Sequence, residues 1–236
     1  MISKKQILIV GVLASSLLGA ATTQAATITL EGSNIRWIYD DATNAVALSL
    51  LGTPVLVGDS VKFEPASFKA EAIGLAGTVI ADATFVFDHV ISKNGNNILS
   101  IQATDYGNYS IVNGTDVGND LFLQAVQGGS PSRVVSQVDS YYNDTLSSGS
   151  WSVSNNLTTI GGPATSPFLT LTSATDLKLT IQDTLSATSL GLNEQAMIQK
   201  SSMLLTAVTP VPVPGSFWLL GSALCGFVTL RRRKSA

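Results

Sequence analysis

Short runs of alternating apolar and polar residues, separated by turn-forming clusters, constrain the fold of this chain more than any other feature. The clearest run is 79–89, where valine, alanine and phenylalanine take the odd positions and Asp82, Thr84 and Asp88 take even ones. Successive side chains of a β-strand point to opposite faces, so this period of two indicates a strand with one buried face. His89 shares the apolar phase, which predicts that it packs in the core or at a sheet edge.

Similar runs recur along most of the chain. Lys93 begins a turn whose Asn94-Gly95 pair suits positive φ, and residues 98–103 are then expected as the return strand of a hairpin. Many short strands without interleaved long helices favour an all-β fold, and we predict a single jelly-roll-like β-sandwich over residues 26–209. The further predicted strands are 121–126, 134–142, 168–172, 177–185 and 197–208.

One region allows two interpretations. Residues 36–39 and 45–50 flank a polar cluster and are predicted to pair as a hairpin. A short helix over the second run, capped by Asp41 and ended by Gly52, is the alternative. We predict no long helix outside residues 1–25 and 214–232.

Residues 1–25 have the three parts of a secretory signal peptide. Two lysines precede an apolar stretch at 7–18, and a small-residue cleavage site ends at Ala25. The apolar stretch is short for a helix that spans a membrane. We therefore expect export through the Sec translocon, with cleavage after Ala25.

The tail, residues 210–236, combines three features. Three prolines alternate with valines and hold the chain extended, because proline fixes φ and lacks an amide donor. An apolar run at 217–230 follows. The apolar segment has about 20 residues counted from Val211 and about 15 counted from Ser216, so its length is marginal for a helix that crosses a bilayer core. Cations that follow an apolar helix remain on the cytoplasmic side. We expect transfer across the inner membrane to stop at Arg231, Arg232, Arg233 and Lys234.

Together these three features resemble a PEP-CTERM sorting signal of Gram-negative bacteria. The motif VPVPG followed by FWLLGSALCGF is most similar to the variant named VPLPA-CTERM, and the resemblance covers only the tail. It departs at Val213, where the main form has Glu and the variant Leu. The resemblance implies cleavage by an exosortase within Pro212, Val213, Pro214 and Gly215, with release to the cell surface or the extracellular matrix. It also implies an association with exopolysaccharide.

Removal of both ends changes the charge of the protein. Six of the thirteen Lys and Arg residues lie in the signal peptide and the tail, so seven remain against sixteen Asp and Glu, a formal charge of −9. This acidic balance argues against nucleic acid or anionic lipid as a partner. The only cysteine, Cys225, lies in the tail, so the domain depends on its apolar core rather than on disulfides.

Catalytic templates find little support in this sequence. The chain has a single histidine and a single cysteine, too few ligands for a zinc site. A Ser-His-Asp hydrolase would have to use that one histidine as its general base. No G-x-S-x-G, phosphate-binding or dinucleotide-binding motif occurs. We assign no catalytic residue and no cofactor. Asp105, Asp139 and Asp144 are interpreted as solvated loop charges.

Two binding sites are considered. The oxygen-rich segment 113–120 is a weak calcium candidate, with Asp116 and Asp120 as carboxylate ligands, although an ordinary Asn/Asp turn explains it better. The second is a sugar-binding patch of aromatic rings, although aromatic residues in strands more often belong to the core. The aromatic candidates are Trp37, Tyr39, Tyr106, Tyr109, Tyr141, Tyr142 and Trp151.

Two classes of function remain open from the sequence. The first is a non-enzymatic surface or matrix protein that contacts polysaccharide. The second is a secreted carbohydrate-active enzyme built on a sandwich. An aromatic strip without an acidic cleft favours the first class, whereas two carboxylates facing each other across a deep groove favour the second.

Overall fold

The alternating runs form antiparallel strands in a computed structural model that describes residues 25–127, 134–158 and 174–210. The described chain consists almost entirely of strands, with one short helix. The elements are β1 (Thr27–Glu31), β2 (Ile35–Asp40), α1 (Ala45–Leu51), β3 (Val55–Val57), β4 (Ser60–Phe63), β5 (Lys69–Ile73), β6 (Gly77–Ser92), β7 (Ser100–Val112), β8 (Asp116–Gln127), β9 (Val134–Asn143), β10 (Ser148–Thr158), β11 (Asp176–Ser189) and β12 (Gln195–Val208).

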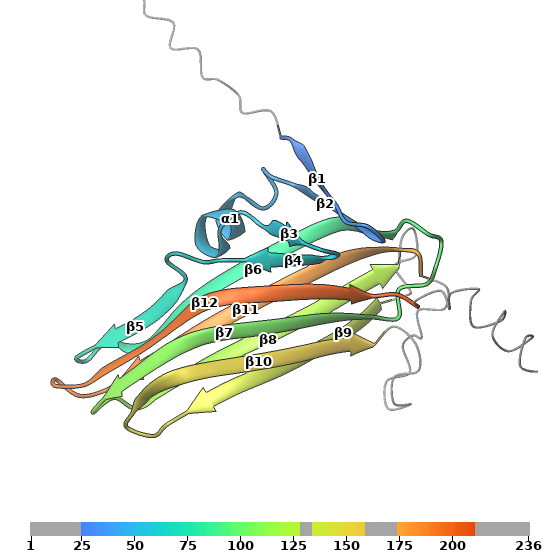
Figure 1. Cartoon of the computed structure of the whole chain (residues 1–236). Helices are drawn as coiled ribbons and strands as arrows, with labels where there is room; N and C mark the ends of the chain where they lie inside the picture. The colour runs from blue at the N-terminus through green and yellow to red at the C-terminus, as the bar shows by residue number, and fades with distance from the viewer. Residues whose placement is uncertain (1–24, 128–133, 159–173, 211–236) are drawn as a thin grey trace, which may run out of the picture.

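The strands form two sheets that face each other (Figure 1). One sheet has the order β1-β2-β6-β11-β8-β9, and the other has the order β10-β7-β12-β4-β3, with β5 also paired to β12. From β5 onward the chain alternates between the sheets, except that β8 and β9 are neighbours in one sheet, and the orders are β5-β12-β7-β10 and β6-β11-β8-β9. Two such four-stranded antiparallel sheets constitute a jelly roll, so the predicted all-β sandwich is confirmed.

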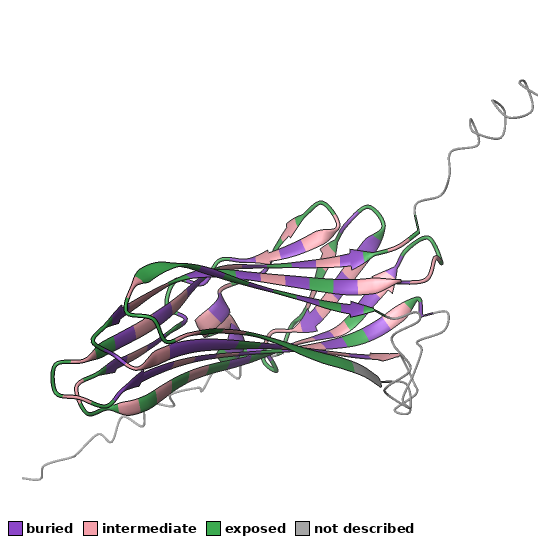
Figure 2. Ribbon diagram, turned by 90° about the horizontal axis from the view of Figure 1, so that it is seen from below, coloured by how far each residue is buried: buried purple, intermediate pink, exposed green. Residues whose placement is uncertain are grey.

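The core lies between the sheets, where buried residues alternate with more exposed ones along the long strands (Figure 2). One end of it is aromatic: the ring centroids of Trp37 and Phe87 are 5.1 Å apart, and those of Phe63 and Phe85 are 5.0 Å apart, both in T-shaped arrangements. Such pairs contribute about 0.5–1.5 kcal/mol each beyond their burial. The apolar phase predicted for 79–87 therefore faces the core.

The prediction for His89 is wrong. The register between β6 and β11 shifts between Leu177 and Leu179, where a bulge inserts an extra residue into β6. A one-residue insertion reverses the side-chain phase. Val90 consequently points into the core, whereas His89 points outward with half of its side chain exposed, its Nδ1 lying 3.0 Å from Oδ2 of Asp176.

The hairpin predicted at 36–50 is also wrong, and the helical alternative is found. β2 pairs with β1 and β6, while residues 45–51 form α1 and end at Gly52, whose φ is 80°. Asn44, rather than Asp41, precedes the helix, and its side chain does not cap it. Instead Asn44 accepts from the Val86 amide at 2.7 Å and donates to the Val86 carbonyl at 3.0 Å. The Asn44 side chain thereby satisfies the backbone groups of β6 at Val86, past the point where β2 stops pairing with β6.

The remaining strand predictions have different outcomes. The other predicted strands are confirmed, except that 168–172 lies outside the described residues. The hairpin predicted to join 79–89 with 98–103 is wrong, because β6 and β7 belong to different sheets and the turn crosses between them. β10 was missed because serine and asparagine fill its outward positions, with Trp151, Val153 and Leu157 directed inward. Within the described ranges, no helix is long and apolar enough to cross a membrane.

Candidate functional site

Three charged side chains and one amide meet in the closed interior between the sheets. Asp105 comes from β7, Asn119 from β8, Asp183 from β11 and Lys200 from β12. None of the four residues is more than 1% exposed. Lysine and aspartate are almost never buried to this extent unless they are paired, so this group, the core charge cluster, is the least expected feature of the domain.

The strands place these residues by the same alternation that buries the apolar core. Asp183 follows Leu179 and Ile181 in phase, and Asp105 follows Ile101 and Ala103. Lys200 lies at the bulge of β12, where the register with β7 shifts between Lys200 and Ser202. Lys200 follows Ala196 and Ile198 in phase, and its backbone amide donates to the Phe68 carbonyl at 3.0 Å.

The ammonium group of Lys200 contacts both carboxylates. Nζ donates to Oδ2 of Asp183 and lies 2.7 Å from Oδ2 of Asp105. Asn119 Nδ2 donates to Oδ1 of Asp183 at 2.6 Å. In the described part of the chain, Asp105 Oδ1 has no hydrogen-bond partner.

The surroundings of the cluster are apolar. Sδ of Met203 lies 3.7 Å from Nζ of Lys200, and the centroid of the Phe68 ring lies 5.9 Å from it. Gly107 of β7 is paired with Lys200 of β12, and a Cβ added to Gly107 would meet the Gln199 carbonyl and the Trp151 ring. The cluster is therefore closely surrounded by protein atoms.

Two carboxyl groups against one ammonium set the protonation of the cluster. Burial raises the pKa of Asp105 to about 7, since the Lys200 charge only partly opposes desolvation and Asp183 adds to it. Burial lowers the pKa of Lys200, but the two carboxylates outweigh it and the net shift is upward. Below about pH 7 the cluster therefore holds a neutral Asp105 beside an ion pair of Asp183 and Lys200, with no net charge.

The interpretation of Asp105 as a solvated loop charge is wrong, because it lies mid-strand in the core. Sequence reasoning also passed over Asp183 and Lys200. A signal was present: each is a charged residue in the apolar phase of a strand, Asp183 between Ile181 and Leu185. A buried position for a charge requires a partner, and the sequence does not show that partner.

A second candidate site lies on the surface, where four turns meet at one end of the sandwich, here called the tip. These are the β5–β6, β7–β8, β9–β10 and β11–β12 turns, which lie together on the left of Figure 1. Hydrogen bonds join neighbouring turns, from the Gly74 amide to the Glu194 carbonyl at 2.9 Å and from the Ile111 amide to the Ser147 carbonyl at 2.8 Å. The tip carries aliphatic side chains that are 53–79% exposed: Ile73, Leu75, Val112, Leu146, Leu190 and Leu192.

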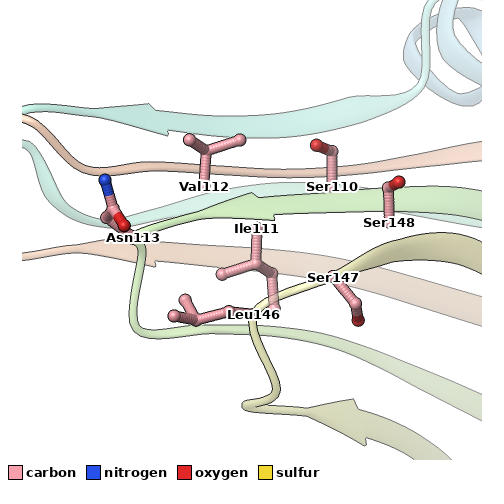
Figure 3. Close-up of a pocket in the computed structure, with 7 residues that line it drawn as sticks. All are labelled: Ser110, Ile111, Val112, Asn113, Leu146, Ser147 and Ser148. Atoms are coloured by element: carbon pink, nitrogen blue, oxygen red, sulfur yellow. The ribbon is translucent and has the colours of Figure 1, made fainter.

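The tip contains a pocket of about 340 Å³ between the end of β7 and the start of β10 (Figure 3). Ile111 and Leu146 point toward each other, while the hydroxyls of Ser110 and Ser148 lie on the opposite side of the β7 ribbon. The Ser147 hydroxyl is 3.1 Å from the Tyr109 hydroxyl, which braces the loop. The lining thus contains hydroxyl groups and apolar side chains, of which Ile111 is buried and Val112 and Leu146 are exposed, and Asn113 completes it.

Most of the segment proposed as a calcium loop is strand. Asp116 and Asp120 belong to β8, and Asp120 accepts a hydrogen bond from the Ser140 hydroxyl at 2.6 Å. Both carboxylates lie on the outer face of the sheet, four positions apart in an extended strand. Among the residues that the structure describes, no three His, Cys, Asp or Glu side chains gather as a metal site would require.

The aromatic candidates do not share one platform. Trp37, Tyr39 and Trp151 are buried. The largely exposed tyrosines are Tyr106 on β7 and Tyr142 on β9, which belong to different sheets and point outward from opposite faces. An aromatic group does form inside the sandwich, where Tyr141 contacts Tyr109 and stacks on Trp151, with centroids 6.0 Å apart in each pair.

The predicted processing sites lie at or beyond the limits of the described chain. Ala25 is the first described residue and is exposed. The residues predicted for sorting (212–215) and for stop transfer (231–234) fall outside the described ranges, so both assignments stay predictions.

Comparisons with known proteins add little to this geometry. The chain matches no protein-family profile, and no curated protein of similar sequence is found. Among solved structures, TmCBM61 in complex with β-1,4-galactotriose aligns with 79% of this chain and 90% of its own, at 8% identity and a TM-score of 0.26. A TM-score this low supports no functional argument.

Proposed function

We propose that the protein is an exported, non-enzymatic surface or matrix protein whose tip binds polysaccharide. It passes the inner membrane through the Sec translocon, is held by the tail and is released outward when an exosortase cuts within 212–215. The observation that carries the proposal is the position of the pocket, which lies at the end of the sandwich opposite the end of β12.

The direction of the last strand sets this arrangement. β12 begins at the tip, where Gln195 pairs with Ile73, and ends at Val208, which pairs with Ser100 at the other end of the sheet. The sorting tail begins two residues later, at Pro210. A domain held through that tail therefore presents its tip away from the attachment point.

The lining of the pocket suits a sugar ring. Hydroxyls of Ser110 and Ser148 supply donors and acceptors, and the exposed side chain of Val112, on the same side of the β7 ribbon (Figure 3), suits the C–H face of a pyranose. Because the exported domain carries a formal charge of −9, a neutral polysaccharide is favoured over a polyanion. The exposed aliphatic residues around the pocket form a patch of the kind that marks interaction sites.

The binding step is tested by native electrophoresis of the full chain in gels that contain the exopolysaccharide of its host. We expect migration to be retarded, and the retardation to be lost in a Leu146→Asp/Ser148→Ala variant. Ser152→Ala, on the same strand but outside the pocket, is the matched control and should be retarded like the unaltered protein. Unretarded wild-type protein would refute binding. Shortening of the polysaccharide would instead favour the enzymatic alternative.

The export step is tested by the C-terminus of the protein recovered from its host. We expect it to end within 212–215. Replacement of Arg231, Arg232, Arg233 and Lys234 by Ser should yield an uncut secreted form, because nothing stops the apolar run in the membrane. Mature protein that still ends at Ala236 would show that the tail is an anchor and not a sorting signal.

A further inference from the structure

We propose that Lys200 and Asp183 condense with each other to form an intramolecular isopeptide bond between β12 and β11. The inference concerns the core charge cluster, which plays no part in the tip or in the tail. It requires neither polysaccharide nor export, because all reacting groups belong to the folded domain.

The first argument is proximity. Nζ of Lys200 contacts Oδ2 of Asp183, and both side chains are held in closed packing with no exposed surface. Reacting groups fixed in contact behave as though present at effective concentrations of about 10⁵–10⁸ M. The Lys200 nitrogen is already in contact with the carboxyl group, and Phe68 and Met203 exclude water from the site of attack.

The second argument is the free energy of the buried charges. Ions removed from water are destabilised, and their mutual attraction repays this cost only in part. An amide carries no charge, and its formation releases one water molecule from a dry core. Burial therefore favours the condensed product more than it would for the same two groups in water.

The third argument is the presence of an acid–base group and an oxyanion donor at the reacting carbon. Asp105 lies 2.7 Å from Nζ and, being neutral below about pH 7, can give and receive protons there. Nδ2 of Asn119 donates to Oδ1 of Asp183 at 2.6 Å, where negative charge develops when the carbon is attacked. This hydrogen bond identifies Asp183, rather than Asp105, as the carboxyl group that becomes the amide.

The step balances without an added reactant. One proton passes from Nζ to the Asp183 carboxylate, which gives an amine and a carboxylic acid. The nitrogen lone pair bonds to Cγ of Asp183, Asp105 accepts a proton from the nitrogen and delivers one to the departing hydroxyl, and the Cγ–O bond breaks. The products are one amide and one water, and Asp105 ends as the acid it was at the start.

The bond would join the two sheets covalently. β11 lies in the β6 sheet and β12 in the β7 sheet, and Lys200 and Asp183 are 17 positions apart across the tip turn. β12 is also the last described strand before the tail. Force applied through the tail would therefore reach the β11 sheet through a covalent bond rather than through side-chain packing alone.

The test is mass spectrometry of the full chain after denaturation, with peptide mapping. Trypsin cleaves after unmodified lysine, so an acylated Lys200 leaves an uncut peptide that begins at Leu179 and weighs one water less than its sequence. Chymotrypsin should then cut after the leucines between Asp183 and Lys200 without separating the two halves. Cleavage after Lys200 at full mass in the folded, purified protein would overturn the proposal.

Variants separate this reaction from other losses of mass. Lys200→Arg should restore the full mass, because the guanidinium is not a nucleophile at neutral pH. Asp105→Asn keeps the size of the side chain but removes the proton carrier, and should also leave Lys200 free. Asp183→Asn offers an amide in place of the acid, so its condensed product should weigh one ammonia less than its sequence. A water loss that persists in Lys200→Arg would place the modification elsewhere and refute the assignment.

Discussion

Lys200 and Lys69 each contact a carboxylate on a strand of the same sheet, at similar distances but in opposite surroundings. Nζ of Lys69 lies 2.9 Å from Glu71, with half of the lysine side chain in solvent. Nζ of Lys200 lies 2.7 Å from Asp105 with no exposure of either group. Exposed pairs contribute about 0–1 kcal/mol because water solvates each partner alone. In the core, an unpaired charge has no such alternative.

This difference shows why only one of the two pairs suggests chemistry. On the surface, water can solvate Lys69 and Glu71 when they separate. In the core, two carboxyl groups share one ammonium, burial raises the pKa of Asp105, and the lysine nitrogen is held against a carboxyl group. Perturbed titration within a fixed, water-free cluster is typical of reactive sites.

The largest expected effect comes from removing the central charge. Lys200→Met keeps the volume filled but leaves two carboxyl groups in the core without their cation. We expect the free energy of unfolding to fall by about 3–5 kcal/mol. The matched surface change, Lys69→Met, should stay within about 0.5 kcal/mol. Urea denaturation of both variants measures the difference. Equal losses would show that burial does not distinguish the two pairs.

The next effect is a dependence of stability on pH. While Lys200 and Asp183 are uncondensed, the folded state keeps the proton of Asp105 up to about pH 7, whereas the unfolded chain releases it near its ordinary pKa of 3.8. Stability from this proton is thus complete below the unfolded pKa and is lost as pH rises through the folded pKa. Between about pH 5 and pH 7 we expect a fall of about 2–3 kcal/mol.

The control for this slope is Asp105→Asn, which keeps the shape but has no proton to lose. Its stability should be nearly constant over the same interval. Surface carboxylates such as Glu71, whose pKa is lowered by Lys69, act with the opposite sign and mainly below about pH 4.5. A slope that survives in Asp105→Asn would assign the titration to another group.

A smaller effect is expected from closing the space beside the cluster. In Gly107→Ala, the new Cβ meets the Gln199 carbonyl and the Trp151 ring, and the backbone atom cannot move aside cheaply. Overpacking of this kind costs about 1–3 kcal/mol. Gly149→Ala, where the nearest atom is the Tyr109 hydroxyl at 3.2 Å, is the milder control because a side-chain tip can shift. Thermal unfolding ranks the two.

Much of the fold could be predicted because the alternation of side chains is local. The run 79–87 faces the core as expected, and the antiparallel sandwich follows from many such runs. The seven residues of α1 could not be assigned from side-chain alternation, because a short apolar run fits a strand or a helix equally well. Asn44 decides between them through its contacts with Val86, far along the chain.

The core charge cluster could be predicted only in part. Asp183 stands in the phase of Ile181 and Leu185, which marks it as a buried charge. Its partners lie on other strands, and the bulge that follows Lys200 puts it out of phase with Met203 and Leu205, the buried residues of the rest of β12. A single sequence does not show the register in which distant strands pair. Neither the contact of Asp183 with Lys200 nor the bulge that turns His89 outward could therefore be predicted from it.

The smallest effect is expected at the pair that this second bulge creates. Because His89 and Asp176 are 51% and 38% exposed, their contact at 3.0 Å competes with water. A double-mutant cycle with His89→Ala and Asp176→Ala should give a coupling of less than about 1 kcal/mol, and salt should reduce it further. The original interpretation of His89 as a core residue requires a much larger loss, since deleting a buried ring leaves a cavity. A cost of several kcal/mol for His89→Ala alone, insensitive to salt, would place that ring inside the sandwich and remove the bulge from β6.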